Sequence, residues 1–331
     1  MAPCWSGPLA PGLAHCASCF GLDEERDLRS APMQQVAARR VTRSRAAAYL
    51  ALTKPRIIEL LLVTTLPTMV VADGGLPPLG LVVWTLVGGA LAAGGANALN
   101  MVADRDIDAV MARTRNRPLV TGALSPAAAL RFALGLEAAA FLLLWGAVNL
   151  LSAVLAVGAT LFYVLVYTLW LKRTSTRNIV IGGAAGAVPV LVGWAAVRGG
   201  LDWPPVLLFA VIFYWTPPHF WALAVRYRDD YTAAEVPMLP AVAGVRATAV
   251  RILGYSLALW GLTVLFAPVA GMGPVYLVAA LGLGALFTWY AVQLLRSATP
   301  ERAMRLFSFS ISYITLLFGA MALDQLLRSG F

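Results

Sequence analysis

The sequence predicts an all-α polytopic membrane protein with nine transmembrane helices, and two observations carry this prediction. Of the 331 residues, 60% are hydrophobic and only 12% are charged, whereas a soluble domain carries about 25% charged residues. The apolar residues also gather in nine runs, each long enough for a helix that crosses roughly 30 Å of hydrocarbon. The runs cover approximately residues 57–73, 79–101, 127–146, 150–171, 179–197, 204–224, 249–269, 273–295 and 306–327.

The N-terminal segment differs from the rest of the chain. Residues 1–45 are polar and lack the apolar core of a signal peptide, so we predict a disordered tail in front of a transmembrane domain at 46–331. A CxxC spacing in this tail can mark a metal or redox pair, but because no second pair follows, we interpret its cysteines as incidental. Met33 is an alternative start, which the intact mass of the native protein would decide. The cysteines are Cys4, Cys16 and Cys19.

The positive charges predict the orientation of the helices. The net charge of +9 lies mainly in the tail and in connections between apolar runs, so membrane topology explains it and nucleic-acid binding is not expected. All Lys and Arg residues except Arg198 and Arg328 lie in the tail or near the connections after the second, fourth, sixth and eighth runs. This side is predicted to be cytosolic, which places the protein in the cell (inner) membrane with its N-terminus inside and its C-terminus outside.

A candidate metal site lies at the end of the second run. Asn100, Asp104 and Asp108 are four residues apart, so on a helix they share one face over roughly 12 Å. Two carboxylates and an amide suit Mg²⁺ that also holds phosphate. An acid inside a membrane helix is a candidate functional group, although a helix end that has merely reached water would show the same residues. Three arginines that can bind an anion follow: Arg113, Arg115 and Arg117.

Three more polar clusters are expected on the same side of the membrane. Their basic residues can bind phosphate or simply anchor helix ends. His219 is the only histidine of the membrane part, and the Pro217-Pro218 pair before it predicts a break in its helix that exposes backbone to a cavity. The clusters are Lys54, Arg56 and Glu59; Tyr163, Tyr167, Lys172, Arg173 and Arg177; and Trp215, His219, Trp221, Arg226, Arg228, Asp229 and Asp230.

Glycines and an internal resemblance add to the picture of a bundle. The glycines predict close helix packing rather than a nucleotide-binding loop, because they lie in apolar sequence with no strand before them. Residues 97–126 and 215–244 resemble one another, since each has a helix end, acids and a loop with proline, which hints at duplication. The glycines concerned are Gly88, Gly89, Gly94, Gly95, Gly182, Gly183 and Gly186.

The clusters have a common chemical sense. Acids for Mg²⁺, cations for phosphate and an apolar bundle behind them predict a substrate with a diphosphate head and a hydrocarbon tail. The cations and Mg²⁺ would stabilise a departing diphosphate, and aromatic side chains would shield an allylic cation. An ion transporter that uses Asp104 and Asp108 is the alternative outside enzymes, although transporter sites usually lie near the bilayer midplane.

At these residues the sequence resembles the UbiA superfamily of intramembrane prenyltransferases, over about residues 48–327. The stretch NALNMVADRDIDAVMARTRNRPL is similar to the superfamily's first Asp-rich motif. The stretches LTKPRIIELL, YTLWLK with NIVIGGAAGAVP, and WTPPHFWALAVRYRDDY with VPMLP resemble the branch that farnesylates haem. The resemblance implies a UbiA-type bundle with a central cavity open to the cytosolic side.

The resemblance also implies roles for individual residues. Mg²⁺ and the diphosphate head would be held by Asn100, Asp104 and Asp108, with Asp230 from a second motif and with Lys172 beside them. This second motif departs from the wider superfamily, because Trp215, His219 and Leu223 stand where spaced acids are usual, and this favours a porphyrin acceptor. The implied substrate contacts are Arg56, Arg117, Tyr167, Arg173, His219 and Arg226.

The implied reaction joins C1 of farnesyl diphosphate to a vinyl group of haem B. Diphosphate leaves and water adds, which gives haem O for terminal oxidases. His219 would either ligate the haem iron or hydrogen-bond a propionate, and the sequence does not choose between them. An aromatic acid such as 4-hydroxybenzoate is the alternative acceptor, and a haem A synthase or an oxidase assembly protein is a conceivable partner.

Overall fold

A computed structural model describes residues 44–330, apart from the side chains at positions 57, 60 and 61. Nearly all of the predicted tail, with its cysteines and Met33, lies outside the described residues. Helix α2 begins at Arg45, and the side chain of Ser44 caps it by accepting a hydrogen bond from the Ala47 N–H at 3.2 Å.

The described chain is helical throughout, as predicted, and contains no strand among its described residues. Long helices alternate with short ones that lie in the connections. The elements are α2 (Arg45–Thr53), α3 (Pro55–Asp73), α4 (Leu79–Ala103), α5 (Arg105–Val110), α6 (Pro126–Ala147), α7 (Leu150–Leu161), the π-helix η1 (Phe162–Leu171), α8 (Lys172–Thr174), α9 (Asn178–Arg198), α10 (Trp203–Arg226), α11 (Arg228–Ala233), α12 (Leu239–Val242), α13 (Gly244–Val269), α14 (Pro274–Arg296) and α15 (Pro300–Arg328).

Eight helical segments within the described residues are long and apolar enough to cross a membrane. They correspond to the second through ninth predicted runs, and α7, η1 and α8 together form one of them. The first run is helical in α3, within which the described residues form an apolar stretch over Leu62–Asp73. The predicted count of nine spanning helices is therefore not confirmed.

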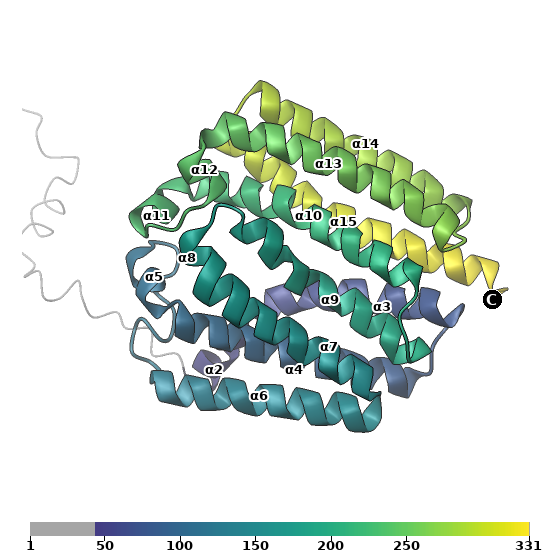
Figure 1. The fold of residues 1–331 in the computed structure, drawn as a ribbon, viewed down its shortest axis with the longest axis horizontal. Coiled ribbons are helices and arrows are strands. Elements are labelled where there is room, and N and C mark those ends of the chain that lie inside the picture. Colours follow the sequence, from purple (N-terminus) through teal and green to yellow (C-terminus); the bar gives the residue numbers. More distant parts are fainter. Residues whose placement is uncertain (1–43, 331) are drawn as a thin grey trace, which may run out of the picture. The chain divides into compact units, whose positions relative to one another are not determined.

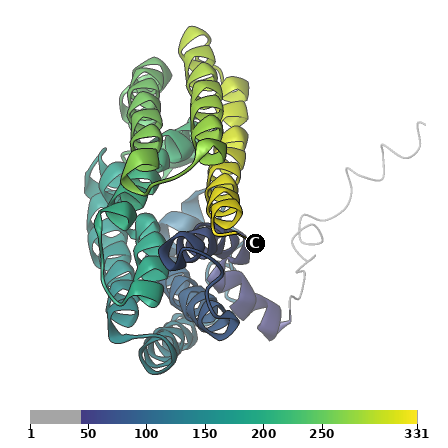
Figure 2. The same cartoon turned by 90° about the vertical axis from the view of Figure 1, so that its right-hand side faces the viewer.

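The long helices lie side by side in a bundle (Figure 1). α6 packs on α4 and α7, and α14 packs on both α13 and α15 at the opposite side of the bundle. Between these groups, α10 packs against α9, α13 and α15, and α3 packs against α9 and α15. Figure 2 shows the same helices after a quarter turn, with α13, α14 and α15 standing apart from α4 and α6.

The short helices gather at one end of this bundle. In Figure 1, α5, α8, α11 and α12 lie at the left, whereas the C-terminal end of α15 lies at the right. We call this end, formed by residues 104–125, 172–177 and 227–243, the loop end. It unites three of the connections that the sequence analysis placed on the basic side.

Two of these connections have the same plan. α4 and α10 each end at a single non-helical residue, Asp104 and Tyr227, and each is followed by a helix of six residues with two acids in its first turn. The resemblance between residues 97–126 and 215–244 is therefore also a resemblance in local structure.

Most of the singled-out glycines lie where helices touch. A Cβ atom on Gly88 would lie 2.5 Å from the Leu144 side chain, and one on Gly183 would lie 2.8 Å from Thr216. Gly94, Gly95 and Gly182 are also in close contact with side chains of neighbouring helices. The prediction is wrong for Gly89 and Gly186, because nothing lies within 4 Å of a Cβ atom at either position.

Helix α10 contradicts the predicted break at Pro217-Pro218. Both prolines lie inside a continuous helix from Trp203 to Arg226. A proline removes one donor and clashes with the preceding turn, but packing of α10 against three long neighbours keeps the helix intact. His219 therefore projects from a regular helix and not from an unwound segment.

Asp324 joins α15 to the start of α14 at the end opposite the loop end. The side chain is 1% exposed and accepts backbone N–H groups of Gly273 at 2.5 Å, Val275 at 3.0 Å and Tyr276 at 3.2 Å. The first N–H groups of a helix have no partner within it, so Asp324 supplies acceptors that α14 lacks.

We expect Asp324→Ala to lower the free energy of unfolding by about 3 kcal/mol or more, because each buried donor left without an acceptor costs about 1–3 kcal/mol. Thermal unfolding of purified protein in detergent measures this loss. Ser329→Ala, an exposed change on the same helix end, is the control. Equal melting temperatures for the two variants would contradict the role given to Asp324.

Candidate functional site

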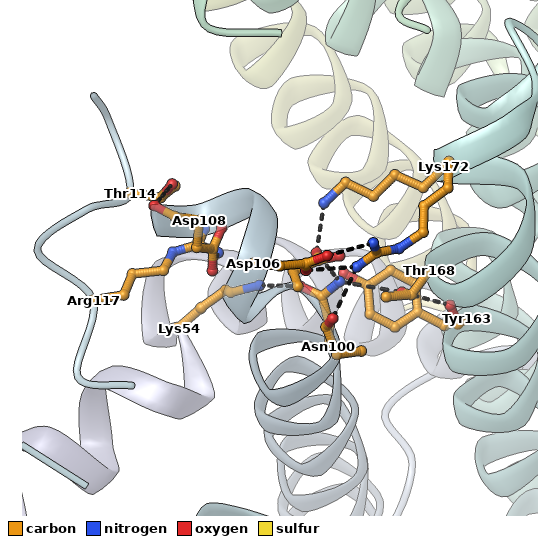
Figure 3. A network of polar contacts seen from close by, with 12 residues as sticks. Lys54, Asn100, Asp106, Asp108, Thr114, Arg117, Tyr163, Thr168 and Lys172 are labelled. Atoms are coloured by element: carbon orange, nitrogen blue, oxygen red, sulfur yellow. Dashed lines mark hydrogen bonds and ion pairs between the residues drawn. The ribbon is translucent and has the colours of Figure 1, made fainter. Parts of the chain in front are cut away.

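The loop end contains a network of buried polar side chains, drawn in Figure 3. Its centre is Asn100, whose Nδ2 donates to Asp104 Oδ2 at 2.7 Å and to Thr168 Oγ1 at 3.1 Å. Asn100 Oδ1 accepts a hydrogen bond from Lys54 Nζ at 2.9 Å. One amide thus connects α4 with η1 and with the residue between α2 and α3.

The predicted face of Asn100, Asp104 and Asp108 is present, although the helix is not continuous. α4 ends at Ala103, α5 begins at Arg105, and Asp104 lies between them with φ −90° and ψ 9°. The four-residue register nevertheless persists, since Asp104 N donates to Asn100 O at 2.9 Å and Asp108 N donates to Asp104 O at 2.8 Å. All three side chains are buried.

Asp104 is the most buried acid of the site, with no exposed surface. Its Oδ2 atom forms an ion pair with Lys172 Nζ at 2.5 Å. Its Oδ1 atom is buried and has no hydrogen-bond partner among the described residues. A buried carboxylate oxygen without a partner is costly, so this atom is the point of the network best suited to receive a cation.

Asp108 is held by the loop that follows it. Its Oδ2 atom forms an ion pair with Arg117 NH1 at 2.5 Å, and Asp108 is 2% exposed. The Thr114 hydroxyl donates to the Asp108 backbone carbonyl at 2.9 Å, which folds the loop back onto α5. The predicted anion-binding Arg117 thus lies directly beside one of the predicted metal ligands.

Lys54, for which phosphate binding and a helix-end anchor were both open from the sequence, lies within the polar network. It lies between α2 and α3 in a left-handed conformation, with φ 53° and ψ 64°, and this sharp change of direction turns its side chain toward Asn100 (Figure 3). Burial lowers the pKa of Lys54 to about 7, and the positive charges of Arg117 and Lys172 act in the same direction. The positive charges already present in the site therefore disfavour the protonated form of Lys54.

Arg173 is placed differently from its neighbour Lys172. It binds Asp106 through both guanidinium nitrogens, at 2.7 and 2.8 Å, and donates to the Ala103 carbonyl at 3.0 Å. The hydrogen bonds from Arg173 hold the pKa of Asp106 well below its usual range. This side chain fastens the end of α4 and the start of α5 to α8.

The π-helix η1 supplies the aromatic wall of the site. Tyr163 and Tyr167 stack with ring centroids 5.4 Å apart. Thr168 donates to the Tyr163 carbonyl, five residues earlier, at 2.9 Å while it accepts from Asn100. π-Helical turns often occur at functional sites, and here one sets the register between two tyrosines and the polar centre.

The second connection meets the first through Asp230. Its Oδ2 atom accepts the backbone N–H of Arg113 at 3.3 Å, and the Arg113 guanidinium lies 5.1 Å from the centre of the Tyr227 ring. Asp230 thus comes from a different connection than Asp104 and Asp108, and no hydrogen bond joins it to them among the described residues. Arg56 and Arg226 are exposed at helix ends of the predicted basic side.

His219 lies in a separate, aromatic environment on α10. Its ring stacks between Trp215 and Phe307, with centroid distances of 4.4 and 4.6 Å, and its Nδ1 atom lies 2.6 Å from Ser310 Oγ. Ser310 belongs to α15 and is 91 positions away in the sequence. No sequence motif signalled this contact.

The donor set fits one kind of metal. Among the described residues no group of three or more His, Cys, Asp or Glu side chains could hold a metal ion, so a site at Asp104 and Asp108 would need a further donor, which the Asn100 amide can supply. All of these are oxygen donors, and oxygen donors with room for water and phosphate suit Mg²⁺. The buried and unpartnered Asp104 Oδ1 agrees with this fit.

Comparison with known proteins places this architecture in a family. The UbiA prenyltransferase family matches residues 61–315. The chain belongs to the UbiA prenyltransferase family. It is 53% identical to the protoheme IX farnesyltransferase of Pseudarthrobacter chlorophenolicus over 285 residues, which cover 85% of this chain and 89% of the relative. It is also 53% identical to that of Frankia casuarinae over 286 residues, which cover 86% of this chain and 99% of the relative.

Solved structures share the fold. A digeranylgeranylglyceryl phosphate synthase matches with a TM-score of 0.71 at 17% identity, over 86% of this chain and 99% of its own. A UbiA homologue from Archaeoglobus fulgidus, bound to GPP and Mg²⁺, matches with a TM-score of 0.59 at 18% identity, over 83% of this chain and 99% of its own. The UbiA-type bundle is confirmed, and the chain is a membrane-embedded prenyltransferase.

The packing of Tyr167 gives a test with a built-in control. A Cβ atom on Gly182 would overlap the Tyr167 ring, whereas one on Gly186, a turn later on α9, would meet nothing within 4 Å. We expect Gly182→Ala to displace Tyr167 and lower prenyl transfer by up to about 10²-fold, the usual effect of a small misplacement in a site. Gly186→Ala should keep its activity. Equal activity of both variants, measured as product per milligram of inserted protein, would exclude Tyr167 from the site.

Proposed function

We propose that this protein transfers the farnesyl group of farnesyl diphosphate to a vinyl group of haem B in an Mg²⁺-dependent reaction. Diphosphate leaves, water adds to the former vinyl group, and the product carries a hydroxyethylfarnesyl side chain. The observation that carries the proposal is the buried network around Asp104, where acids and lysines meet at the mouth of an apolar bundle. Relatives named protoheme IX farnesyltransferase, 53% identical, support the acceptor.

The acids of the site are assigned to the metal. Asn100, Asp104 and Asp108, with Asp230 from the other connection, would hold Mg²⁺, which would neutralise charge that develops on the departing diphosphate. A UbiA homologue with the same fold binds GPP and Mg²⁺, which supports the use of a divalent metal in the reaction.

The cations of the site are assigned to the diphosphate. Lys54 and Lys172 bind Asn100 Oδ1 and Asp104 Oδ2, the oxygens that a divalent cation would also use. With Mg²⁺ held by these oxygens, the Nζ atoms of Lys54 and Lys172 would be free to contact phosphate. Arg117, which forms an ion pair with Asp108, would likewise be free to contact phosphate with a metal bound at Asp108. Arg56, Arg173 and Arg226 add positive charge around the entrance.

The apolar part of the bundle is assigned to the hydrocarbon chain. Loss of diphosphate leaves positive charge on the allylic carbon, and the faces of the stacked Tyr163 and Tyr167 rings attract such a charge. No cysteine is present in residues 44–331, and the reaction needs no covalent enzyme nucleophile, because the vinyl group itself attacks C1 of the farnesyl chain.

The orientation follows from the charges. The loop end carries the basic connections, so we place it, with the N-terminal tail, at the cytosolic face of the cell membrane and the C-terminus outside. The diphosphate substrate would then enter from the cytosol into a central cavity, and the farnesyl chain would extend into the bundle.

We expect Asp104→Asn and Asp108→Asn each to lower turnover by at least about 10²-fold, because each removes negative charge that binds the metal near the leaving group. The measurement is the mass of the haem product in membranes given haem B, farnesyl diphosphate and Mg²⁺. Asp229→Asn is the matched control, since Asp229 lies at the same end but its side chain is 99% exposed.

Two outcomes would contradict this function. Near wild-type turnover in Asp104→Asn or Asp108→Asn would remove the metal assignment. Prenylation of 4-hydroxybenzoate, with haem B left unchanged by the same membranes, would replace the acceptor while leaving the prenyltransferase fold intact.

A further inference from the structure

The imidazole of His219 is enclosed by aromatic rings from two helices, α10 and α15. Trp215 and Phe307 stack on its two faces, with interplanar angles of 20° and 27°, and Phe220 meets it edge-on. The residue is 7% exposed. Three aromatic rings thus fix the plane of the imidazole ring. The hydrogen bonds of its two nitrogens then determine its tautomer.

Ser310 determines whether Nδ1 of His219 carries a proton. Ser310 is fully buried, and its hydroxyl donates to the Phe307 carbonyl on its own helix at 2.6 Å. The same oxygen lies 2.6 Å from His219 Nδ1. A hydroxyl has a single proton to donate and two lone pairs to accept with, so a serine that donates to Phe307 O can only accept from the imidazole.

The position of the proton follows from this count. Since Ser310 accepts, Nδ1 must carry the proton. No acid forms an ion pair with His219 among the described residues, and a charged ring surrounded by aromatic side chains would be costly. A neutral imidazole has one proton, so Nε2 is left with a free lone pair.

The second nitrogen is available. No described residue bonds Nε2, and the residue retains 7% of its surface exposed. A free and accessible lone pair on a rigid ring is how histidine binds metals, and in such sites the other nitrogen usually donates to an oxygen of the protein.

We propose that Ser310 is a positioning residue that sets His219 in the Nδ1-protonated tautomer, so that Nε2 ligates the iron of the haem acceptor. An unprotonated Nε2 cannot donate a hydrogen bond to a propionate carboxylate, so the geometry selects the iron over the propionate. The tautomer itself is a property of the protein alone, whereas the identity of the iron-containing ligand rests on the proposed function.

Residue 310 also aligns the neighbouring ring. Its backbone carbonyl accepts the indole N–H of Trp215 at 2.9 Å. A single residue of α15 therefore orients both Trp215 and His219, which lie one turn apart on α10. A change confined to the Ser310 hydroxyl leaves the carbonyl in place and so separates the two roles.

Nuclear magnetic resonance of the full chain tests the tautomer. The sequence has two histidines, His15 and His219, so ¹⁵N-histidine labelling of a His15→Gln protein in nanodiscs reports His219 alone. We expect a protonated-type shift at Nδ1 and an unprotonated-type shift at Nε2. In Ser310→Ala this pattern should give way to a mixture of tautomers. A protonated Nε2 in the parent protein, or an unchanged pattern in Ser310→Ala, overturns the proposal.

Titration with two porphyrins tests the ligand. Iron protoporphyrin IX should bind with a shift of its Soret band that His219→Ala abolishes, and metal-free protoporphyrin IX should bind equally to both proteins. Ser310→Ala should weaken iron porphyrin binding roughly 10-fold or more, as loss of an outer-shell partner does at metal sites, and Ser310→Thr, which keeps the hydroxyl, should restore part of it. Ser312→Ala, an exposed change two residues away, is the control.

The outcomes separate this inference from the proposed function. His219-dependent binding of metal-free porphyrin would assign His219 to a propionate and overturn the iron assignment, while haem farnesylation would stand. The expected tautomer together with no porphyrin binding at all would overturn the iron assignment and the haem acceptor at once. Loss of iron binding in Ser310→Ala with farnesyl diphosphate binding unchanged supports the proposal.

Discussion

The pairing of the buried Asp104 carboxylate with the Lys172 ammonium group is the interaction on which the loop end depends. Asp104 has no exposed surface, and a carboxylate in such a place is tolerated only with a compensating charge. Lys172, the first residue of α8, supplies this positive charge from more than sixty positions along the chain. The end of α4 and the end of the α7–α8 segment are thereby held together by opposite charges, as are α5 and α8 through Asp106 and Arg173.

This arrangement allows the lysine contacts at Asp104 and Asn100 to be exchanged for a metal ion. The Asp104 oxygens are unequal, because one is bound to Lys172 and the other has no hydrogen-bond partner within residues 44–330 as described. A divalent cation would satisfy the second oxygen and compete with the ammonium groups for the first. With a divalent cation bound, Lys54 and Lys172 would be free to contact phosphate, so metal and diphosphate binding would support each other.

Much of this could be predicted from the sequence. The apolar runs predicted the helices because hydrocarbon requires long apolar stretches, and the four-residue spacing of Asn100, Asp104 and Asp108 survived the break between α4 and α5 because the backbone hydrogen bonds keep their register. The first run also forms a helix, α3, and the described residues within it are apolar over Leu62–Asp73.

The remaining errors have physical causes that a linear pattern does not contain. Lys54 reaches Asn100 only because its backbone is left-handed. Ser310 contacts His219 because α15 packs on α10. In the sequence, its neighbours do not distinguish it from Ser308 or Ser312. The predicted break at Pro217 and Pro218 failed because packing by neighbouring helices outweighed the local preference of proline.

The most direct test of the exchange between lysines and metal is a crystal structure of the protein with Mn²⁺ in place of Mg²⁺ and a farnesyl diphosphate analogue that cannot react. Anomalous scattering would locate the metal. The account predicts Mn²⁺ bound by Asp104 and Asp108, with the Nζ atoms of Lys54 and Lys172 moved to phosphate oxygens. A metal bound elsewhere, with both lysines still on Asn100 and Asp104, would contradict it.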